Sequence, residues 1–375
     1  MSRKDRMSGN EAVACAMRQI DPDVVAAFPI TPSTEIPQFI SKFKADGLVT
    51  TEFIAVESEH SAMSAVTAAS AAGARTFTAT SSQGLLHMHE ILHYASGGRL
   101  PVVMVNVNRA VLAPWCLYAD HQDSISQRDT GWLQLFCSCH QEIYDSVFLA
   151  YKVAEKTDMP VMISYDGFLL SHSLLPFETV DDALIKKYLP VRDPAWRLHP
   201  DIGGNFSNVA MAAEYSSYRH RLADDTLVSL QVFRDSIKEY EFLTGRPQPG
   251  LIESSGPKDA DVFILSMGSM ASEMEIVASE LSKQGTKAAA LKVRLYRPFP
   301  VDELIEQLPN GSTLVVLDRN IAYGHPGGVL LMEARSALYG CGKDVKVVGG
   351  SVGLGGVDLT VSLLLAEVQR LMGVK

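Results

Sequence analysis

Short apolar runs alternate along this chain with segments long enough to form helices. In the first half these runs occupy residues 24–28, 53–56, 76–80, 101–107 and 160–164. The run at 101–107 is almost continuously apolar and rich in valine, which is typical of a strand buried on both faces of a sheet. Strands separated by helix-length segments predict an α/β protein with a parallel sheet.

The same alternation returns after a connector. Residues 171–204 are irregular and contain several prolines, and residues 212–241 predict a charged helix on the surface. Beyond them, further strands are expected at 261–265, 288–293, 312–317 and 345–348, with helices between them. We therefore predict a first domain, 1–250, whose C-terminal connector covers about 171–250, and a second domain, 251–375.

The composition is that of an ordinary globular protein and argues against several functions. The 375 residues carry 33 Lys and Arg against 43 Asp and Glu, which gives a formal net charge of −10. A sequence-independent nucleic-acid binder would need a basic surface instead. No apolar run approaches the roughly 20 residues of a membrane span, and residues 1–6 lead into no apolar signal core. We expect a cytoplasmic protein that binds neither nucleic acid nor membranes.

Five cysteines limit the redox chemistry that this chain can perform alone. Cys137 and Cys139 form a C-x-C pair, and the sequence contains no C-x-x-C pair. Neither a zinc ribbon nor a ferredoxin-type iron–sulfur cluster has that spacing. An odd number of cysteines in a chain that is not exported indicates thiols in a reducing compartment. If the protein does redox work, its clusters must lie on another chain.

Polar residues gather where the predicted strands end. Thr31 and Ser33 follow the first strand, Glu57 and Glu59 follow the second, and Arg109 follows a later one. The carboxyl ends of parallel strands share one edge of a sheet, and ligands bind there. Each residue also has a plainer explanation, namely helix capping, an acidic first helical turn or a surface ion pair. Their coincidence at one edge favours a binding site.

The segment 108–128 has almost no periodicity although it lies within the first predicted domain. A long irregular segment inside a compact α/β domain is usually a functional loop. The glycine-rich segments 324–328 and 349–356 match neither a dinucleotide fingerprint nor a phosphate loop. We interpret both as tight connections at a domain interface.

A zinc hydrolase is an alternative from another class. His89, Glu90 and His93 match H-E-x-x-H, in which two histidines one helical turn apart bind zinc and the glutamate is the general base. Such a site needs a third ligand, and the available His121 and His140 lie in no recognisable downstream motif. The pattern fixes only three positions, so chance matches are common. We favour a helix that faces a subunit or an active-site cleft, and we expect no metal site on this chain.

Motifs spread over nearly the whole chain resemble one enzyme family. The first predicted domain contains F-P-I-T-P-S-T-E from residue 28, V-E-S-E-H-S-A from 56, G-A-R-T-F-T-A-T-S-S-Q-G from 73, N-R-A from 108, D-H-Q-D from 120, R-D-T-G-W from 128 and Y-D-G-F from 165. The second contains K-V-R-L-Y-R-P-F-P from 292 and G-L-G-G-V-D from 353. Together they resemble the α subunits of the 2-oxoacid:ferredoxin oxidoreductase family, and within it those of pyruvate:ferredoxin oxidoreductase (pyruvate synthase).

The resemblance implies an enzyme whose thiamine diphosphate lies between two subunits. The α subunit would supply a pyrimidine-type thiamine-diphosphate-binding domain with a parallel sheet, followed by a transketolase C-terminal-like α/β domain. The β subunit would hold the pyrophosphate through Mg²⁺. This chain contains no Gly-Asp-Gly followed by a paired Asn, the motif that binds the pyrophosphate, and Asp166-Gly167 lacks the leading glycine. The chain therefore looks like half of an active site.

The family's functional residues transfer to matching positions. Glu59 would pair with a ring nitrogen of the aminopyrimidine, with Glu57 as the local alternative. Thr31 would hydrogen-bond the 2-oxoacid, and Arg109 would bind its carboxylate. Ser82 and Gln83 would also contact the cofactor. The resemblance places the substrate pocket among Pro29, Ile30, Asn108, Trp115, Asp120 and His121, and the loop 111–123 would exclude water from it.

The implied reaction converts pyruvate, CoA and oxidised ferredoxin to acetyl-CoA, CO₂ and reduced ferredoxin. Electrons would leave singly through 4Fe–4S clusters on partner chains, namely the β subunit and the γ and δ subunits, which supply a CoA-related domain and ferredoxin-like clusters. Relatives act on 2-oxoglutarate, branched-chain 2-oxoacids, indolepyruvate or oxalate. Thr31 favours a small, uncharged tail, and Trp115 would narrow the pocket or reflect a different substrate. A scaffold that docks other subunits without touching the cofactor is a further hypothesis.

Overall fold

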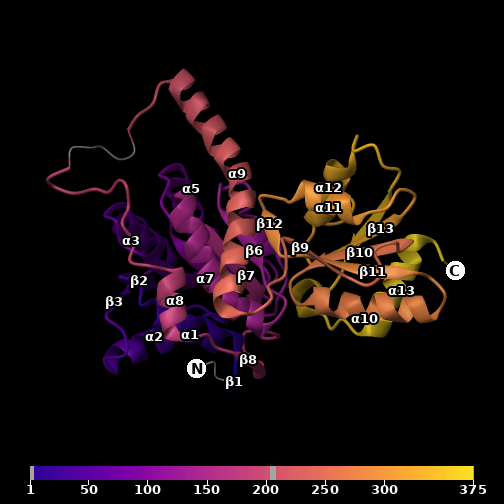
Figure 1. Ribbon diagram of the computed structural model, residues 1–375, viewed down its shortest axis with the longest axis horizontal. Helices are drawn as coiled ribbons and strands as arrows, with labels where there is room; N and C mark the ends of the chain where they lie inside the picture. Colours follow the sequence, from indigo (N-terminus) through magenta and orange to yellow (C-terminus); the bar gives the residue numbers. More distant parts are fainter. Residues whose placement is uncertain (1–3, 203–207, 375) are drawn as a thin grey trace.

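The computed structural model describes residues 4–202 and 208–374 and contains two α/β units side by side (Figure 1). The first unit has a seven-stranded sheet with the order β12-β6-β7-β5-β4-β2-β3, parallel except between β12 and β6. The strands are β2 (Val24–Ala27), β3 (Glu52–Ala55), β4 (Thr76–Thr80), β5 (Val103–Asn108), β6 (Leu133–Phe136), β7 (Val161–Asp166) and β12 (Leu295–Arg297). The predicted parallel α/β fold is therefore confirmed.

Helices cover both faces of this sheet. One face carries α1 (Gly9–Ile20), α2 (Glu35–Ala45) and α7 (His140–Thr157), and the other carries α3 (Glu59–Ala71), α4 (Ser82–His87) and α5 (His89–Gly97). Strand β5 shows how the sequence specifies this arrangement. Val103, Val105 and Val107 pack into the core under α1 and α7, whereas Met104 packs into the core under α3 and α5. All six residues of β5 are buried, as its apolar sequence predicts.

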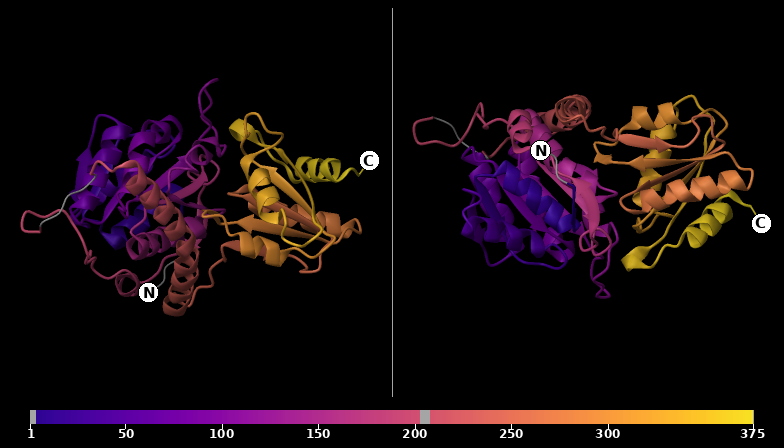
Figure 2. Two further views of the ribbon diagram at one scale, coloured as in Figure 1. Left: turned by 90° about the horizontal axis from the view of Figure 1, so that it is seen from above. Right: turned by 60° about the horizontal axis from the view of Figure 1, so that its bottom comes forward.

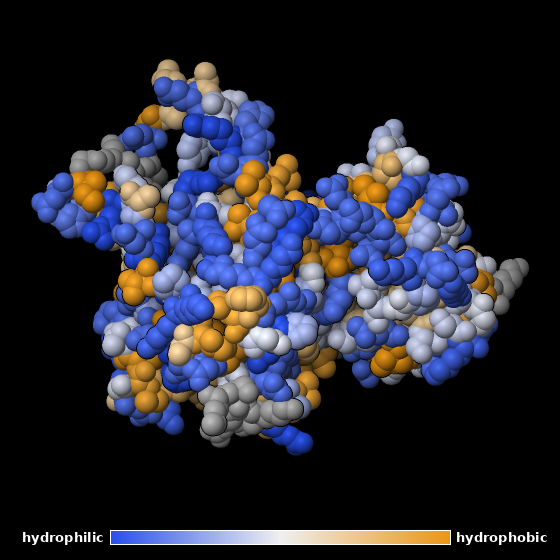
Figure 3. Space-filling view, viewed as in Figure 1, coloured by the Kyte–Doolittle hydropathy of each residue, from blue (hydrophilic) through white to orange (hydrophobic). Residues whose placement is uncertain are grey.

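The predicted connector is more regular than its sequence suggests. It contains β8 (Leu175–Glu178), which pairs with β1 (Lys4–Met7), then α8 (Asp182–Tyr188) and α9 (Ala212–Thr244). The C-terminal half of α9 packs against α7 through Phe233 and Tyr240. Its N-terminal half projects from the body (Figure 1) and is covered mainly by hydrophilic residues, with scattered apolar side chains (Figure 3).

The second unit has a five-stranded sheet with the order β14-β13-β10-β11-β9, in which only β9 is antiparallel to its neighbour. Its strands are β9 (Ile252–Ser255), β10 (Val262–Met267), β11 (Ala288–Val293), β13 (Thr313–Asp318) and β14 (Lys346–Ser351). One face carries α10 (Met270–Lys283) and α13 (Val361–Met372), and the other carries α11 (Val301–Gln307) and α12 (Val329–Leu338). In the described ranges, no helix combines the length and apolar character that a membrane crossing requires.

One short stretch of chain belongs to both sheets. β11 lies between β10 and β9 in the second sheet, and two residues after its end β12 pairs antiparallel with β6 at the edge of the first sheet. Between the two strands lies Arg294, which is fully buried and donates to the carbonyl oxygen of Pro249 at 2.7 Å and to Oε1 of Gln248 at 3.1 Å. The domain boundary that we predict near residue 250 falls just before β9, the first strand of the second sheet. At β12 the chain returns to the first unit and adds a strand to its sheet.

A buried ion pair connects the two units next to this crossing. Lys292 on β11 contacts the carboxylate of Glu142 on α7, and their side chains are only 11% and 7% exposed. Burial by itself would raise the pKa of Glu142, but the cations of Lys292 and Arg294 lower it overall. A carboxylate whose pKa is lowered in the folded state stabilises the protein above its ordinary pKa, and this stabilisation is lost as the pH falls through the folded value.

Lys292→Met should lower the free energy of unfolding by about 3–5 kcal/mol, because it leaves Glu142 buried without its cation. The matched control is Lys287→Met, whose partner Asp259 is largely exposed, so that change should cost about 1 kcal/mol or less. Urea denaturation at neutral pH measures both. When the measurement is repeated below pH 4.5, the ordinary pKa of a glutamate, the difference in unfolding free energy between wild type and Lys292→Met should become smaller. A difference that grows as the pH falls would contradict this account.

Candidate functional site

The carboxyl ends of the parallel strands meet at one edge of the seven-stranded sheet. The chain runs from β2 outward to β3 and from β4 in the opposite direction to β5, so β2 and β4 flank a topological switch point. β2 pairs with β3 over four residues, but with β4 only at Val24–Thr76 and Val25–Phe77. The strands therefore separate toward their carboxyl ends, and open α/β sheets bind ligands at such a crevice.

Arg109 follows β5 directly and connects three loops at this edge. Its Nη1 donates to the carbonyl oxygen of Thr31 after β2, and its Nη2 donates to Oε1 of Gln83 after β4, each at 2.6 Å. The residue is only 4% exposed, and burial lowers the pKa of its guanidinium, which still remains a cation. Its buried Nε–H has no partner among the described residues. The guanidinium therefore keeps donors available for an anionic ligand.

The carboxylate of Asp123 holds the backbone around Arg109. It lies on α6 (Gln122–Ile125), is fully buried, and accepts from the backbone N–H groups of Ser82 at 3.0 Å and Arg109 at 3.1 Å. The side-chain amides of Asn106 and Asn108 donate to it at 3.0 and 2.8 Å. Burial raises the pKa of Asp123, and these four hydrogen bonds oppose that shift. One carboxylate thus ties the ends of β4 and β5 to the loop that follows them.

Glu59 is the first residue of α3, directly after its N-cap Ser58. The residue is 9% exposed, and its Oε2 lies 3.4 Å from Nδ1 of His87 at the end of α4. Its Oε1 lies against Gly84, where a Cβ atom would come within 2.8 Å of that oxygen. Residue 84 must therefore be glycine for this carboxylate to occupy its position beside the start of α4.

Glu57, the predicted alternative, has a different environment. It is exposed and accepts a hydrogen bond from the hydroxyl of Ser61 in the first turn of α3, which lowers its pKa. This contact is local to the start of the helix. Of the two carboxylates, Glu59 is the one that is nearly buried and lies against the loop after β4.

Three of the predicted pocket residues are used inside the protein. The amide of Asn108 donates to Asp123 and its side chain is fully buried. Asp120 accepts from the backbone N–H of Gly355 in the second unit at 3.1 Å. His121 is 1% exposed, with Nε2 at 3.1 Å from the carboxylate of Asp166. These polar groups make contacts inside the protein, and the expected place of the three residues in a substrate pocket stays a prediction.

The other predicted residues lie around the crevice in different ways. Ser82 is fully buried and donates to the carbonyl oxygen of Ala110 at 2.7 Å, so its hydroxyl braces the loop. Pro29 is exposed and Ile30 is half-buried after β2. Trp115 is 69% exposed, with its ring centroid 5.9 Å from Cζ of Arg109. The loop that carries Trp115 projects from the body (Figure 2).

A polar cluster that sequence analysis missed lies between the two units. Arg319, which follows β13, donates to Asp166 at the end of β7 at 2.9 Å and to the carbonyl oxygen of Ala119 at 3.0 Å. Burial by itself would raise the pKa of Asp166, but Arg319 and His121 lower it strongly. The backbone N–H of Ser269 donates to the same carboxylate at 2.8 Å. Arg319 and Asp166 each come shortly after a predicted strand, and this position was the one sequence signal that could have pointed to them.

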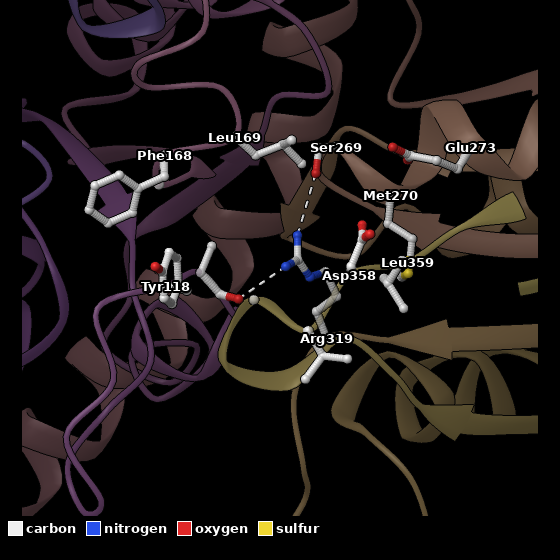
Figure 4. Close-up of a pocket in the computed structure, with 13 residues that line it drawn as sticks. Tyr118, Phe168, Leu169, Ser269, Met270, Glu273, Arg319, Asp358 and Leu359 are labelled. Atoms are coloured by element: carbon white, nitrogen blue, oxygen red, sulfur yellow. Dashed lines mark hydrogen bonds between the residues drawn. The ribbon is translucent and has the colours of Figure 1, made fainter. Parts of the chain in front are cut away.

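A cavity of about 370 Å³ borders this cluster (Figure 4). Its lining combines both units: Tyr118, Phe168 and Leu169 come from the first, and Ser269, Met270, Glu273, Arg319, Asp358 and Leu359 come from the second. Gly167, which also lines it, packs so closely on the carbonyl oxygen of Asn108 that a Cβ would approach it to 2.5 Å. The cavity therefore adjoins the loops that form the crevice.

The zinc-hydrolase hypothesis finds no support in the geometry. His89 and His93 do share a face of α5, with ring centroids 5.0 Å apart, but Nδ1 of His89 is 2.5 Å from Oε1 of Gln127. The side chain of Glu90 is 84% exposed. Within residues 4–202 and 208–374, no group of three His, Cys, Asp or Glu side chains is placed to hold a metal ion.

Asp123→Ala should lower the free energy of unfolding by about 3 kcal/mol, because it strands several buried donors. Asp129→Ala is the control, since that carboxylate is 79% exposed and pairs with the neighbouring Arg128. Thermal unfolding followed by circular dichroism compares the two. Equal melting temperatures for both variants would show that Asp123 does not hold the loops together.

Family models and relatives agree with this arrangement. Residues 15–229 match the family described as "Pyruvate flavodoxin/ferredoxin oxidoreductase, thiamine diP-bdg", and residues 260–364 match "Pyruvate:ferredoxin oxidoreductase core domain II". The chain is 43% identical to ketoisovalerate oxidoreductase subunit VorA of Pyrococcus abyssi, over 96% of this chain and 91% of that one. It is 42% identical to pyruvate synthase subunit PorA of Thermotoga maritima, over 94% and 90%.

Solved structures with low sequence identity share the fold. The 2-oxoglutarate:ferredoxin oxidoreductase of Magnetococcus marinus superposes with a TM-score of 0.73 at 19% identity, covering 98% of this chain and 65% of that chain. A split-gene transketolase superposes with a TM-score of 0.58 at 17% identity, covering 98% and 99%. Both match the two-unit α/β arrangement. With the family models and the relatives, they lead to one conclusion: the chain belongs to the 2-oxoacid:ferredoxin oxidoreductase family, as a counterpart of its α subunits.

Proposed function

We propose that this chain is the α subunit of an enzyme that converts pyruvate, CoA and oxidised ferredoxin to acetyl-CoA, CO₂ and reduced ferredoxin. The observation that carries this proposal is the crevice at the switch point, where the cation of Arg109 and the carboxylate of Glu59 both lie against α4, at Gln83 and Gly84. The relatives named pyruvate synthase subunit PorA, at 40% and 42% identity, support the choice of pyruvate.

The residues at the crevice fit the aminopyrimidine half of thiamine diphosphate. Glu59 offers a nearly buried carboxylate, and among residues 4–202 and 208–374 its one hydrogen-bonding neighbour is His87, at 3.4 Å. Nε2 of Gln83 is buried without a partner in the described part of the chain. An amide donor and a carboxylate acceptor suit a ring that has both a basic nitrogen and an amino group. Thiamine diphosphate, when bound, supplies the acidic ring carbon and the electron sink that decarboxylation of a 2-oxoacid requires.

The chain's own groups then have separate tasks. Glu59 would hold a proton at the pyrimidine ring nitrogen. A carboxylate at that place would favour the imino tautomer of the aminopyrimidine, which can act as a base toward the acidic ring carbon. Arg109 would bind the substrate carboxylate through the donors that Thr31 and Gln83 leave unused. The exposed Thr31 hydroxyl would donate to the 2-oxo oxygen. Trp115, beside Arg109, would cover the substrate and exclude water.

Partner subunits would supply the rest of the enzyme. The β subunit would hold the pyrophosphate through Mg²⁺, since this chain carries no Gly-Asp-Gly motif for it. Two electrons per turnover would leave singly to ferredoxin through 4Fe–4S clusters on the β, γ and δ subunits. Five cysteines without cluster spacing agree with that division.

A branched-chain 2-oxoacid is the second candidate substrate. Three relatives named ketoisovalerate oxidoreductase subunit VorA are each 43% identical to this chain. The loop near Arg109 also exposes apolar side chains, with Leu112 and Leu117 at 42% and 41% exposure beside Trp115. Such an apolar loop would fit the branched side chain of a larger 2-oxoacid as well as the methyl group of pyruvate.

The substrate choice can be measured directly in the assembled complex. We expect kcat/KM for pyruvate to exceed that for 2-oxoisovalerate by about tenfold or more, because a pocket closed by Trp115 excludes extra methyl groups. Reduction of a viologen dye in the presence of CoA provides the assay. The opposite order would favour the branched-chain enzyme and leave the rest of the proposal intact.

Glu59→Gln in the assembled complex should lower turnover by about 100-fold or more, because an amide cannot exchange the proton at the ring nitrogen. Glu57→Gln is the control and should stay within about twofold of wild type, since Glu57 is exposed and its carboxylate accepts from the hydroxyl of the nearby Ser61. Comparable losses in the two variants, or full activity of Glu59→Gln, would remove Glu59 from the site and favour the scaffold hypothesis.

A further inference from the structure

His87 is the side chain that contacts the carboxylate at the crevice. Its Nδ1 lies 3.4 Å from Oε2 of Glu59, whereas Oε1 of Glu59 lies against the position of Gly84. The two oxygens thus have different surroundings, one beside an imidazole and one against the first turn of α4. No other hydrogen bond or ion pair to this carboxylate is recorded in the described residues.

The ring of His87 lies near a second histidine, which in turn approaches a carboxylate on α5. It ends α4, its ring lies 5.9 Å from that of His60 on α3, and Nε2 of His60 is 3.5 Å from the carboxylate of Glu90 on α5. The four side chains form a row from the nearly buried Glu59 to the exposed Glu90. The side chain of His87 is 56% exposed, so the protein does not need it for its core.

We propose that His87 is a positioning residue for Glu59, which it orients by donating from Nδ1 to Oε2. The donation leaves Oε1 directed at the place where a ring nitrogen would be bound. A carboxylate on a flexible side chain would otherwise rotate about its terminal torsion, which has only a weak preference. This inference rests on the proposed function, because it assigns His87 a task in the cofactor site.

The test uses His87→Leu and His87→Gln in the assembled complex. Leucine removes the hydrogen-bond donor, whereas glutamine keeps one. His220→Leu is the matched control, because that histidine lies exposed on the projecting part of α9. Two measurements do not depend on turnover: the affinity for thiamine diphosphate, and the rate at which the cofactor's reactive ring proton exchanges with deuterium.

We expect His87→Leu to weaken thiamine diphosphate binding and to slow proton exchange by about fivefold each, which corresponds to about 1 kcal/mol. KM for the 2-oxoacid should stay unchanged, because Arg109 and Thr31 bind that part of the site. His87→Gln should recover most of the loss, and His220→Leu should match wild type. Melting temperatures should be the same for all four proteins.

Two results would overturn the assignment. One is His87→Leu with wild-type affinity and exchange, and the other is His87→Gln as impaired as His87→Leu. These outcomes differ from a failure of the proposed function. If the wild-type complex neither bound thiamine diphosphate nor exchanged its ring proton, the whole cofactor site would be rejected, and not only the role of His87.

Discussion

The site depends on one buried carboxylate. Asp123 accepts hydrogen bonds from backbone groups after β4 and β5 and from two asparagine amides of β5. Because charged acceptors inside a protein must be fully satisfied, this arrangement leaves the loops little freedom. It sets the direction in which Arg109 leaves β5 and so brings its guanidinium to Thr31 and Gln83. The buried hydrogen bonds to Asp123 therefore fix the position of the segments that line the crevice.

A second constraint fixes the two α/β units against each other. β12 extends the first sheet with residues that follow β11 of the second, and the pair of Lys292 with Glu142 adjoins this crossing. At the crevice, Arg319 donates to Asp166 and to the loop that carries Tyr118 and Trp115. The second unit thus touches the loop beside the candidate substrate site. This contact gives the second unit a structural part in shaping the crevice.

Much of the fold was predictable because burial leaves a clear pattern. The valine-rich run of β5 and the strand at Thr76–Thr80 were recognised from their sequences alone. Thr31, Glu59 and Arg109 could be chosen as candidates because the carboxyl ends of parallel strands coincide. The internal contacts of Asn108, Asp120 and His121 were not predictable, since a sequence does not tell whether a polar side chain points into a crevice or into a buried network. Arg319 was missed because its partner, Asp166, is 153 residues away in the chain.

The central claim is that this chain holds half of a thiamine diphosphate site. We propose Glu59 and Gln83 for the aminopyrimidine side, whereas the sequence has no motif for the pyrophosphate. The most direct measurement is thiamine-diphosphate-dependent decarboxylation of pyruvate by the purified chain, with and without its β subunit and cluster-bearing partners. We predict no activity for the chain alone and CoA-dependent viologen reduction when the partners are added. Decarboxylation by the chain alone would contradict the shared site.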